Sequence, residues 1–350
     1  MSELLVEKQN STIILTLNRE KVLNALNLNM VRIISKNILQ WKNDDNVSGV
    51  LIRGLGDKSF CAGGDIVSVY HNRRDKNSTL FYDFFREEYL LNYEISQFGK
   101  PWISLLNGIA MGGGLGLSVH GSHRIVSEKT ITAMPETAIG LFPDVGGGYF
   151  LSRMQGYLGT YLALTGITLD GENSLYAGIG TNILENSSVN DFVKEILDLG
   201  KYNKNDIDNL IVKYDNYKTI NPSLKKDKLL INKNFNKENI QEIFKSLKIE
   251  NSDWSKKQLS ILNKKSPTSM AVATKQLILS KELDIKECLK MEFRICQAMM
   301  SKHDFYEGVR ANLVDKDRNP NWKPKNISEL DDIEVDSHFK NLKDKELFNL

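Results

Sequence analysis

A run of glycines and two carboxylates lie close together in one stretch of the chain, residues 107–148. The glycines occupy positions 112–114, and each carboxylate, Glu136 and Asp144, directly follows a proline. Because glycine has no Cβ, a ligand atom can come close to its backbone N–H. A carboxylate can serve as acid, base or nucleophile. The stretch therefore predicts a site that stabilises an oxyanion and either moves a proton or attacks a carbonyl.

A second glycine pair, Gly63 and Gly64, lies in the segment SFCAGGD and precedes Asp65. The Asp65 carboxylate is placed to cap a short helix beginning at Ile66, since it can accept hydrogen bonds from the N–H groups of the first turn. Taken alone, the segment is interpreted as a turn followed by a helix N-cap. Its two glycines also form a second segment in which backbone N–H groups are accessible to a ligand.

Two adjacent glutamates, Glu87 and Glu88, fall within an amphipathic pattern that predicts a helix in residues 71–98. Neighbouring residues on a helix point in different directions, so at most one of the two can face a site shared with the apolar side. The residues alone favour a solvent-exposed pair. The apolar side is expected to carry Phe81, Phe84, Phe85, Tyr89 and Leu90.

The elements that would position these residues alternate between strands and helices. Apolar and β-branched runs predict strands at residues 12–17, 48–53, 102–106, 124–127 and 130–133. Helical spacing predicts helices at residues 24–43, from residue 66, and at 71–98, 149–164 and 174–177. The glycine run is expected to follow the 102–106 strand at once and to open a helix through Leu115, Leu117 and Val119. This order is typical of an α/β fold.

The second half of the chain is predicted to be largely helical. Residues 182–265 are rich in Asn and Lys, but Asp and Glu interleave throughout, which favours solvated surface helices over a nucleic-acid-binding arm. After Ser266, helical spacing continues through Ile295 and predicts one long helix. Residues 319–325 are expected to be extended, and the charged end of the chain is expected to fray.

Composition excludes several classes of protein. Basic and acidic residues nearly balance, at 46 and 44, which gives a formal net charge of +2 and no global field that would attract nucleic acid or an anionic membrane. No apolar run approaches the roughly 18 residues that a membrane helix needs. The N-terminus resembles neither a secretory signal nor an Arg-rich presequence. An odd number of widely spaced cysteines argues against a disulfide framework and favours a reducing compartment; they are Cys61 and the expected core residues Cys288 and Cys296.

Other catalytic motifs are incomplete or missing. The GxSxG motif of a Ser/His/Asp hydrolase is incomplete around Ser118, because His120 stands where its second glycine should be. The GxGxxG motif of a dinucleotide-binding fold is incomplete too, because Leu117 stands where its last glycine should be. The sequence has no P-loop lysine and no HExxH, and its five histidines show no paired metal spacing. No metal site is therefore expected.

Three motifs stand in order along the chain: FCAGGD at residues 60–65, NGIAMGGGLGLS at 107–118 and MPETAIGLFPDVGGGYFL at 134–151. They resemble the crotonase (enoyl-CoA hydratase/isomerase) superfamily, and within it most closely the 3-hydroxyisobutyryl-CoA hydrolases. The likeness continues in LALTG, SPTS, HDFYEGVRA and DKDRNPNWKP, and is weakest at residues 182–265. It implies an α/β spiral of ββα turns at residues 1–200 with the CoA thioester site, a mainly helical region at 201–330 and a charged tail at 331–350.

The resemblance also implies which residues form the site. It implies an acyl-CoA thioester whose carbonyl oxygen is bound by the backbone N–H groups of Gly64 and Gly113. Hydratases of the superfamily use two glutamates; here the first position is Gly116, and only the second, Glu136, is present. Asp144 follows a proline as in the hydrolase branch, so the resemblance favours hydrolysis over hydration.

In the implied mechanism, Glu136 either attacks the thioester to give an acyl-enzyme anhydride or activates water, and CoA thiolate leaves. Asp144 would orient water or the 3-hydroxyl of the substrate, and the two nearby carboxylates are expected to titrate as a coupled pair. Glu88 matches a glutamate that contacts substrate in the hydrolase branch. The family region near the adenine end of CoA matches Lys21, Asn24 and Leu26, and the Lys21 ammonium could meet phosphate.

The implied reaction is hydrolysis of a short 3-hydroxyacyl-CoA, above all 3-hydroxyisobutyryl-CoA, as in valine breakdown. Two alternatives stay open: an enoyl-CoA hydratase or isomerase of the same fold, and a catalytically silent homologue acting as an interaction subunit. Composition and resemblance together imply no cofactor besides the CoA of the substrate, no nucleic-acid or membrane partner, and compatibility with a homo-oligomer. The resemblance implies a mitochondrial matrix setting in eukaryotes, with the cytoplasm as the alternative.

Overall fold

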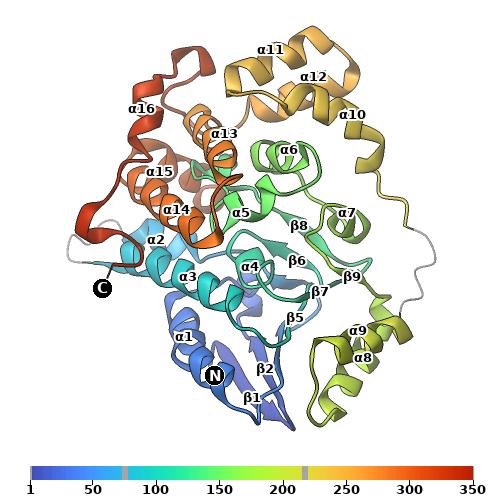
Figure 1. The fold of residues 1–350 in the computed structure, drawn as a ribbon. Coiled ribbons are helices and arrows are strands. Elements are labelled where there is room, and N and C mark those ends of the chain that lie inside the picture. The colour runs from blue at the N-terminus through green and yellow to red at the C-terminus, as the bar shows by residue number, and fades with distance from the viewer. Residues whose placement is uncertain (1, 73–77, 215–219, 350) are drawn as a thin grey trace. The chain divides into compact units, whose positions relative to one another are not determined.

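The computed structural model describes residues 2–72, 78–214 and 220–349 (Figure 1). The chain packs into two compact units, each assembled from separate stretches. The first unit comprises Met1–Gly64, Leu90–Ala133 and Thr168–Lys225, and the second comprises Asp65–Tyr89, Met134–Ile167 and Lys226–Leu350. These units are defined by packing and do not follow the boundaries expected at residues 200 and 330, which remain a prediction.

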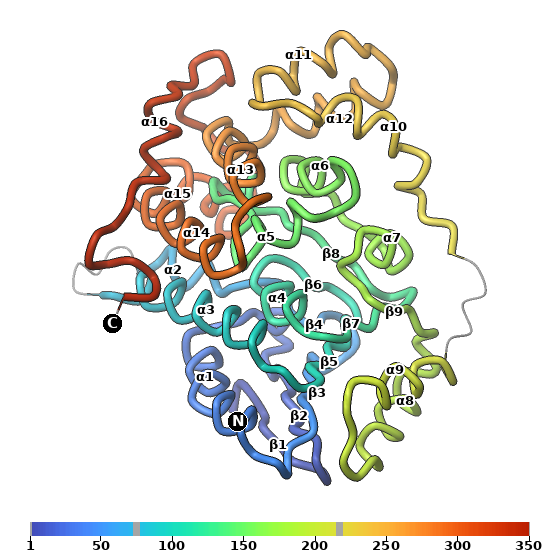
Figure 2. The backbone as a smooth tube through the Cα atoms, in the orientation of Figure 1, coloured from blue at the N-terminus to red at the C-terminus, as the bar shows by residue number. Residues whose placement is uncertain are grey.

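The first unit contains a six-stranded sheet in the order β1-β2-β3-β5-β7-β9 (Figures 1 and 2). Its strands are β1 (Leu4–Gln9), β2 (Thr12–Leu17), β3 (Gly49–Gly54), β5 (Trp102–Leu105), β7 (His123–Val126) and β9 (Asn182–Ile183). The β1–β2 pair is antiparallel, and each following pair is parallel. Every side chain of β2 is buried, which explains why its sequence, TIILTL, is an apolar and β-branched run without polar alternation.

A second, smaller sheet in the same unit repeats one connection three times. Its parallel strands, in the order β4-β6-β8, are β4 (Ser59–Cys61), β6 (Ile109–Met111) and β8 (Ile131–Ala133). Each of them follows a strand of the large sheet along the chain, so β3 leads to β4, β5 to β6 and β7 to β8. This repetition is the ββα spiral implied by the sequence resemblance, and the α/β fold class is confirmed.

The connection after β5 corrects one prediction. The glycine run does not follow this strand at once, because β6 intervenes after a turn at Gly108, whose φ is +74°. A Cβ at Gly108 would lie 2.3 Å from the carbonyl oxygen of Lys58, so only glycine fits there. The helix that the glycines open, α4 (Gly113–Gly116), ends before Leu117 and Val119, so the longer helix predicted there is wrong.

Helices cover the large sheet through apolar side chains. Asn27 caps α1 (Leu28–Asn43) by accepting a hydrogen bond from the Met30 N–H at 3.0 Å. The unit also contains α7 (Gly171–Tyr176), α8 (Asn186–Asp198) and α9 (Lys204–Tyr214). One core cluster joins strand residues such as Ile103 to Phe192 of α8 and Ile207 of α9. This part of the Asn- and Lys-rich region is therefore helical, as predicted, with one apolar face buried on the sheet.

The second unit is mainly helical (Figure 1). It contains α2 (Ile66–Asn72), residues 80–89 of α3 (Leu80–Ser96), α5 (Gly147–Ser152), α6 (Leu158–Thr165), most of α10 (Leu224–Phe235), α11 (Ile240–Glu250), α12 (Asp253–Leu262), α13 (Pro267–Ser280), α14 (Ile285–Met300), α15 (His303–Val309) and α16 (Asp332–Ser337). In the part of the chain that the structure describes, no helix is long and apolar enough to cross a membrane.

Two predicted helices are each divided in the structure. The pattern at residues 149–164 belongs to α5 and α6, with a break after Ser152. The pattern that begins after Ser266 belongs to α13 and α14, because Asp284 accepts a hydrogen bond from the Glu287 N–H and starts a new helix. Hydrophobic spacing continues across both breaks, so the spacing alone did not reveal them.

Two expectations about exposure are wrong. Phe81 is 36% exposed, so it does not share the buried side of α3 with Phe84 and Tyr89. The end of the chain does not fray as predicted, because Leu347 is fully buried and the Arg294 guanidinium donates to the Glu346 carboxylate at 2.8 Å. The buried contact of Leu347 gives this charged segment a fixed position in its unit.

Candidate active site

In the first unit, the two glycine loops lie side by side. They leave the ends of β4 and β6, which are neighbouring parallel strands. Gly63 has a φ of +112°, and a Cβ built on it would lie 3.4 Å from the Met111 carbonyl oxygen and 3.9 Å from the Gly113 nitrogen. The structure therefore brings the loop carrying Gly64 close to the loop carrying Gly113, which is the arrangement that two cooperating N–H donors require.

The Gly113 N–H has a reason to be available for a ligand. Gly113 is the first residue of α4, and the first N–H groups of a helix have no acceptor within the helix. The neighbouring glycine serves packing, since a Cβ on Gly114 would lie 2.2 Å from the Cys61 carbonyl oxygen. Gly116 is buried in the same short helix and supplies no carboxylate.

In the second unit, three acidic side chains are buried together. Glu88 on α3 is 1% exposed, Asp144 is 4% exposed, and Glu136 at the start of a 3-10 turn, η2 (Glu136–Ile139), is 5% exposed. The charge of Asp144 acts on both glutamates, and that of Glu136 acts on Glu88. The structure therefore unites the three predicted carboxylates, and we call them the carboxylate cluster. The solvent-exposed position that the residues alone favoured for Glu88 is wrong.

Burial decides the protonation of the carboxylate cluster. It raises the pKa of Glu136 and of Glu88 well above their ordinary range, and the negative charge of Asp144 raises both further. Burial also raises the pKa of Asp144, to about 6, although a hydrogen bond from Tyr89 holds it down. The first negative charge therefore resides on Asp144 near neutral pH, while the glutamates retain their protons. These mutual effects agree with the coupled titration expected from the sequence, which remains a prediction.

Tyr89 contacts the carboxylate cluster, and the sequence reasoning missed it. Its hydroxyl donates to Asp144 Oδ2 at 2.7 Å, and the residue is fully buried. The prediction treated Tyr89 only as part of the apolar side of a helix. Its position directly after Glu88 was the available signal, because a buried tyrosine needs a partner for its hydroxyl.

Glu292 is a second residue that was missed, and it fixes the loop that carries Asp144. Its carboxylate accepts hydrogen bonds from the N–H groups of Gly146 and Gly148 at 2.7 and 2.8 Å. The amide of Gln276 donates to Glu292 at 3.2 Å and to the Pro143 carbonyl oxygen at 2.8 Å. Burial raises the pKa of Glu292 to about 8 despite these donors.

Lys265 approaches the carboxylate cluster from another direction. A Cβ on Gly166 would lie 3.2 Å from the Lys265 ammonium and 3.1 Å from the Cα of Pro135, so the ammonium lies beside the residue that precedes Glu136. Burial lowers the pKa of Lys265 to about 8, and the charge of Glu136 opposes that shift. In return, Lys265 lowers the pKa of Glu136.

The residues expected near the adenine end of CoA have different surroundings. Lys21 is exposed on a 3-10 turn. The Asn24 side chain is 1% exposed and donates to the carbonyl oxygens of Leu55 and Ser59. Leu26 is fully buried, and its N–H donates to the Gly63 carbonyl oxygen at 2.8 Å. Leu26 thus holds the first glycine loop and Asn24 holds the segment before it, while a CoA contact through the Lys21 ammonium remains a prediction.

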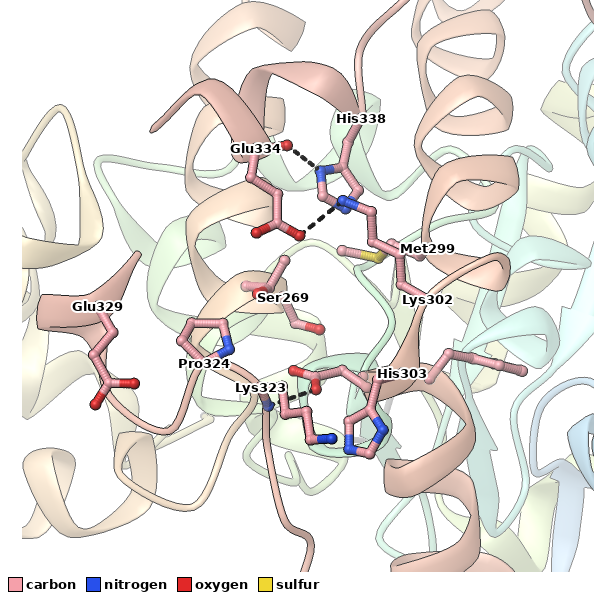
Figure 3. Close-up of a pocket in the computed structure, with 13 residues that line it drawn as sticks. Ser269, Met299, Lys302, His303, Lys323, Pro324, Glu329, Glu334 and His338 are labelled. Carbon is pink, nitrogen blue, oxygen red and sulfur yellow. Dashed lines mark hydrogen bonds and ion pairs between the residues drawn. The ribbon is translucent and has the colours of Figure 1, made fainter. Parts of the chain in front are cut away.

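A metal site and a further cavity are the other features that could serve a function. Among the residues placed in the structure, no group of three or more His, Cys, Asp or Glu side chains could hold a metal ion. A cavity of about 410 Å³ in the second unit is lined by residues such as Lys302, His303, Glu334 and His338 (Figure 3). None of the predicted site residues lines this cavity.

Comparison with known proteins agrees with the motifs. Residues 12–339 match the family enoyl-CoA hydratase/isomerase. Over 99% of this chain, the human protein "3-hydroxyisobutyryl-CoA hydrolase, mitochondrial" is 42% identical and the chicken protein of the same name is 43% identical, with 90% and 91% of those proteins covered. The chain belongs to the enoyl-CoA hydratase/isomerase family, as the sequence resemblance predicted.

Solved structures give the same fold. A carnitinyl-CoA dehydratase from Mycobacterium thermoresistibile is 30% identical with a TM-score of 0.92, and covers 99% of this chain and 98% of its own. An enoyl-CoA hydratase from Rhodobacter sphaeroides is 31% identical with a TM-score of 0.90, and covers 99% of both chains. The crotonase-like fold is therefore confirmed over nearly the whole chain.

The Glu292 contacts predict a loss of stability in the variant Glu292→Gln. A glutamine amide would place an N–H₂ group against one of the N–H groups of Gly146 and Gly148, leaving a buried donor unpaired at a cost of about 1–3 kcal/mol. Denaturant unfolding measures this change. The control is Glu287→Gln on the same helix, where a partly exposed pair with Lys290 is lost and a change below about 0.5 kcal/mol is expected.

The wild type and Glu292→Gln also differ in how their stability depends on pH. Because the folded state holds the Glu292 proton up to a pKa of about 8 while an unfolded glutamate loses it near 4.5, this group stabilises the protein at low pH and the contribution is lost as the pH rises through 8. Between pH 4.5 and pH 8, Glu292→Gln should therefore lose less stability than the wild type. Equal stabilities and equal pH slopes would contradict the assigned role.

Proposed function

We propose that this chain hydrolyses 3-hydroxyisobutyryl-CoA to 3-hydroxyisobutyrate and CoA. The observation that carries the proposal is the burial of Glu136 with Asp144 in a chain where Gly116 supplies no second glutamate. Addition of water to an alkene by this superfamily needs that second glutamate, whereas thioester hydrolysis needs one carboxylate and a proton acceptor. The names of the curated relatives support the same reaction.

In the proposed mechanism, the N–H groups of Gly64 and Gly113 bind the thioester oxygen and stabilise the negative charge that develops on it. Glu136 first transfers its proton to Asp144, which is the ionised member of the cluster near neutral pH; the transfer is uphill, because the pKa of Glu136 lies above the value of about 6 for Asp144. The Glu136 carboxylate then attacks the thioester carbon, or activates water that does so, and the C–S bond breaks. The departing CoA thiolate takes the proton that Asp144 accepted, which leaves Asp144 ionised again.

In the anhydride route, a second step follows. Water attacks the anhydride, releases 3-hydroxyisobutyrate and restores the Glu136 carboxyl group. Tyr89 keeps its hydrogen bond to Asp144 throughout and stabilises the charged form of that carboxylate. Both routes need the same residues, so the proposal covers both.

Glu88 gives the proposal its acyl specificity. Its Oε1 atom is buried and has no hydrogen-bond partner among the described residues, which is costly unless a ligand supplies one. The 3-hydroxyl of the substrate would supply this partner. A site of this kind discriminates strongly against an analogue that lacks the hydroxyl.

The remaining parts of the proposal concern setting and partners. The curated relatives are named mitochondrial, which supports a mitochondrial location for this chain. The partner is the acyl-CoA substrate, with no separate cofactor, and its adenine end is proposed to lie near Lys21. Solved relatives named hydratase and dehydratase make hydration the second candidate reaction, which the glycine at position 116 opposes.

A panel of acyl-CoA esters tests the proposed reaction. Release of free thiol from 3-hydroxyisobutyryl-CoA should exceed release from isobutyryl-CoA, which lacks only the 3-hydroxyl, by about 100-fold or more in kcat/KM. Crotonyl-CoA should show no loss of enoyl absorbance. Equal thiol release from both saturated esters would remove the substrate assignment, and rapid hydration of crotonyl-CoA would favour the second candidate.

The hydrogen bond to Asp144 predicts a shifted pH profile for Tyr89→Phe. Losing this bond raises the pKa of Asp144 above about 6, so protonation inactivates the enzyme at a higher pH. The acid limb of kcat/KM should move upward by about one pH unit, the equivalent of one hydrogen bond to a charged group. Tyr82→Phe on the same helix is the control, since that ring packs on Phe293 and its loss of a hydroxyl should leave the limb unchanged.

A further inference from the structure

A second cavity in the helical unit is lined by basic side chains and by no acidic ones. It measures about 440 Å³ and lies among α11, the end of α12, the start of α13 and residues 325–328. Three lysines line it, and no acidic side chain does; the lysines are Lys248, Lys265 and Lys325. In contrast, the cavity of Figure 3 combines lysines with acids, and Lys302 there pairs with Glu334 at 3.0 Å.

We call the cavity of about 440 Å³ the basic cavity; no acid in its lining opposes the positive charge, although Glu136 acts on Lys265 from outside the lining. None of the three lysines forms an ion pair with a described residue. Glu329, the acid next along the chain, already accepts hydrogen bonds from the Lys325 N–H and the Asn326 amide, and it lines the other cavity. Lys264 adds a further positive charge that acts on Lys265. A concave surface with one sign of charge attracts a counter-ion.

The remaining lining of the basic cavity suits an anion attached to a small organic body. Uncharged polar side chains come from Gln241, Asn263, Asn326 and Ser328. The apolar wall is formed by Phe244, Leu262, Pro267, Met270 and Ile327. Lysine is a flexible point charge with three N–H donors, and several lysines around one hollow match the spread charge of a phosphate group.

We propose that the basic cavity binds a phosphate-bearing small molecule, at a site whose lining shares no residue with the carboxylate cluster. Lys248 and Lys325 contact the phosphate, and Lys265 stands between this ligand and Glu136. The Lys265 side chain lines the cavity, while its ammonium lies beside the Pro135 backbone. The negative charge of the bound ligand partly offsets the positive charge of Lys265 that acts on Glu136. This inference does not depend on the proposed reaction.

The first experiment measures binding of inorganic pyrophosphate to the full chain by calorimetry, at constant ionic strength and with free CoA present to fill the substrate's own phosphate contacts. One pyrophosphate should bind per chain. The double variant Lys248→Gln/Lys325→Gln should bind at least about tenfold more weakly, the equivalent of one lost charge-assisted hydrogen bond. Lys256→Gln on α12, exposed and outside the cavity lining, is the matched control and should bind as the wild type does.

A second measurement follows sulfate binding between pH 7 and pH 9, where sulfate does not titrate and Lys265 does. Since the Lys265 pKa is about 8, sulfate binding by the wild type should weaken as the pH rises from 7 to 9, and in Lys265→Met this change should be smaller. Glu136, Lys248, Lys264 and Lys325 also face this region. Glu136, whose pKa burial raises, accounts for the pH dependence that the variant retains. Absence of saturable pyrophosphate binding, equal binding by the double variant, or displacement of pyrophosphate by CoA would overturn the proposal.

Discussion

Burial of several carboxylates in one place is the constraint on which the site depends. Glu88, Glu136 and Asp144 are each almost completely removed from water, and a low-dielectric environment tolerates few negative charges. The cluster therefore retains protons near neutral pH, with the first charge on Asp144. In the proposed mechanism a proton moves from Glu136 to Asp144, so that one carboxylate is freed for attack while the other holds its proton.

The fold holds the two sets of groups by different means. Three successive strand pairs place the glycine loops at the ends of neighbouring strands, so their backbone N–H groups are fixed by the sheet. The acidic groups depend on helices, because α3 carries Glu88 and Tyr89, and the loop with Asp144 is fastened by Gln276 and Glu292. The hydrogen bonds of Gln276 and Glu292 hold the loop so that the Asp144 carboxylate stays buried. The stability of the loop and the proposed chemistry therefore depend on the same hydrogen bonds.

The sequence predicted what is encoded locally and missed what depends on distant contacts. Most strands, the cap at Asp65 and the motif carboxylates were predicted because neighbouring residues determine them; the Ser68 N–H does donate to Asp65, at 3.1 Å. Tyr89 and Glu292 were missed because their partners lie 55 and 146 residues away along the chain. The break between α13 and α14 was also missed, although Asp284 and Glu287 carry a readable capping signal.

The central claim is that Glu136 carries the chemistry of the carboxylate cluster, and one variant tests it directly. Glu136→Gln keeps the size of the side chain but can neither attack a thioester nor accept a proton. Stopped-time assays of thiol release from 3-hydroxyisobutyryl-CoA, together with unfolding midpoints and the matched variant Glu87→Gln, measure its effect. A fall in kcat of about 100-fold or more with an unchanged unfolding midpoint is predicted. A folded Glu136→Gln protein whose kcat stays within a few-fold of the wild type would contradict the account.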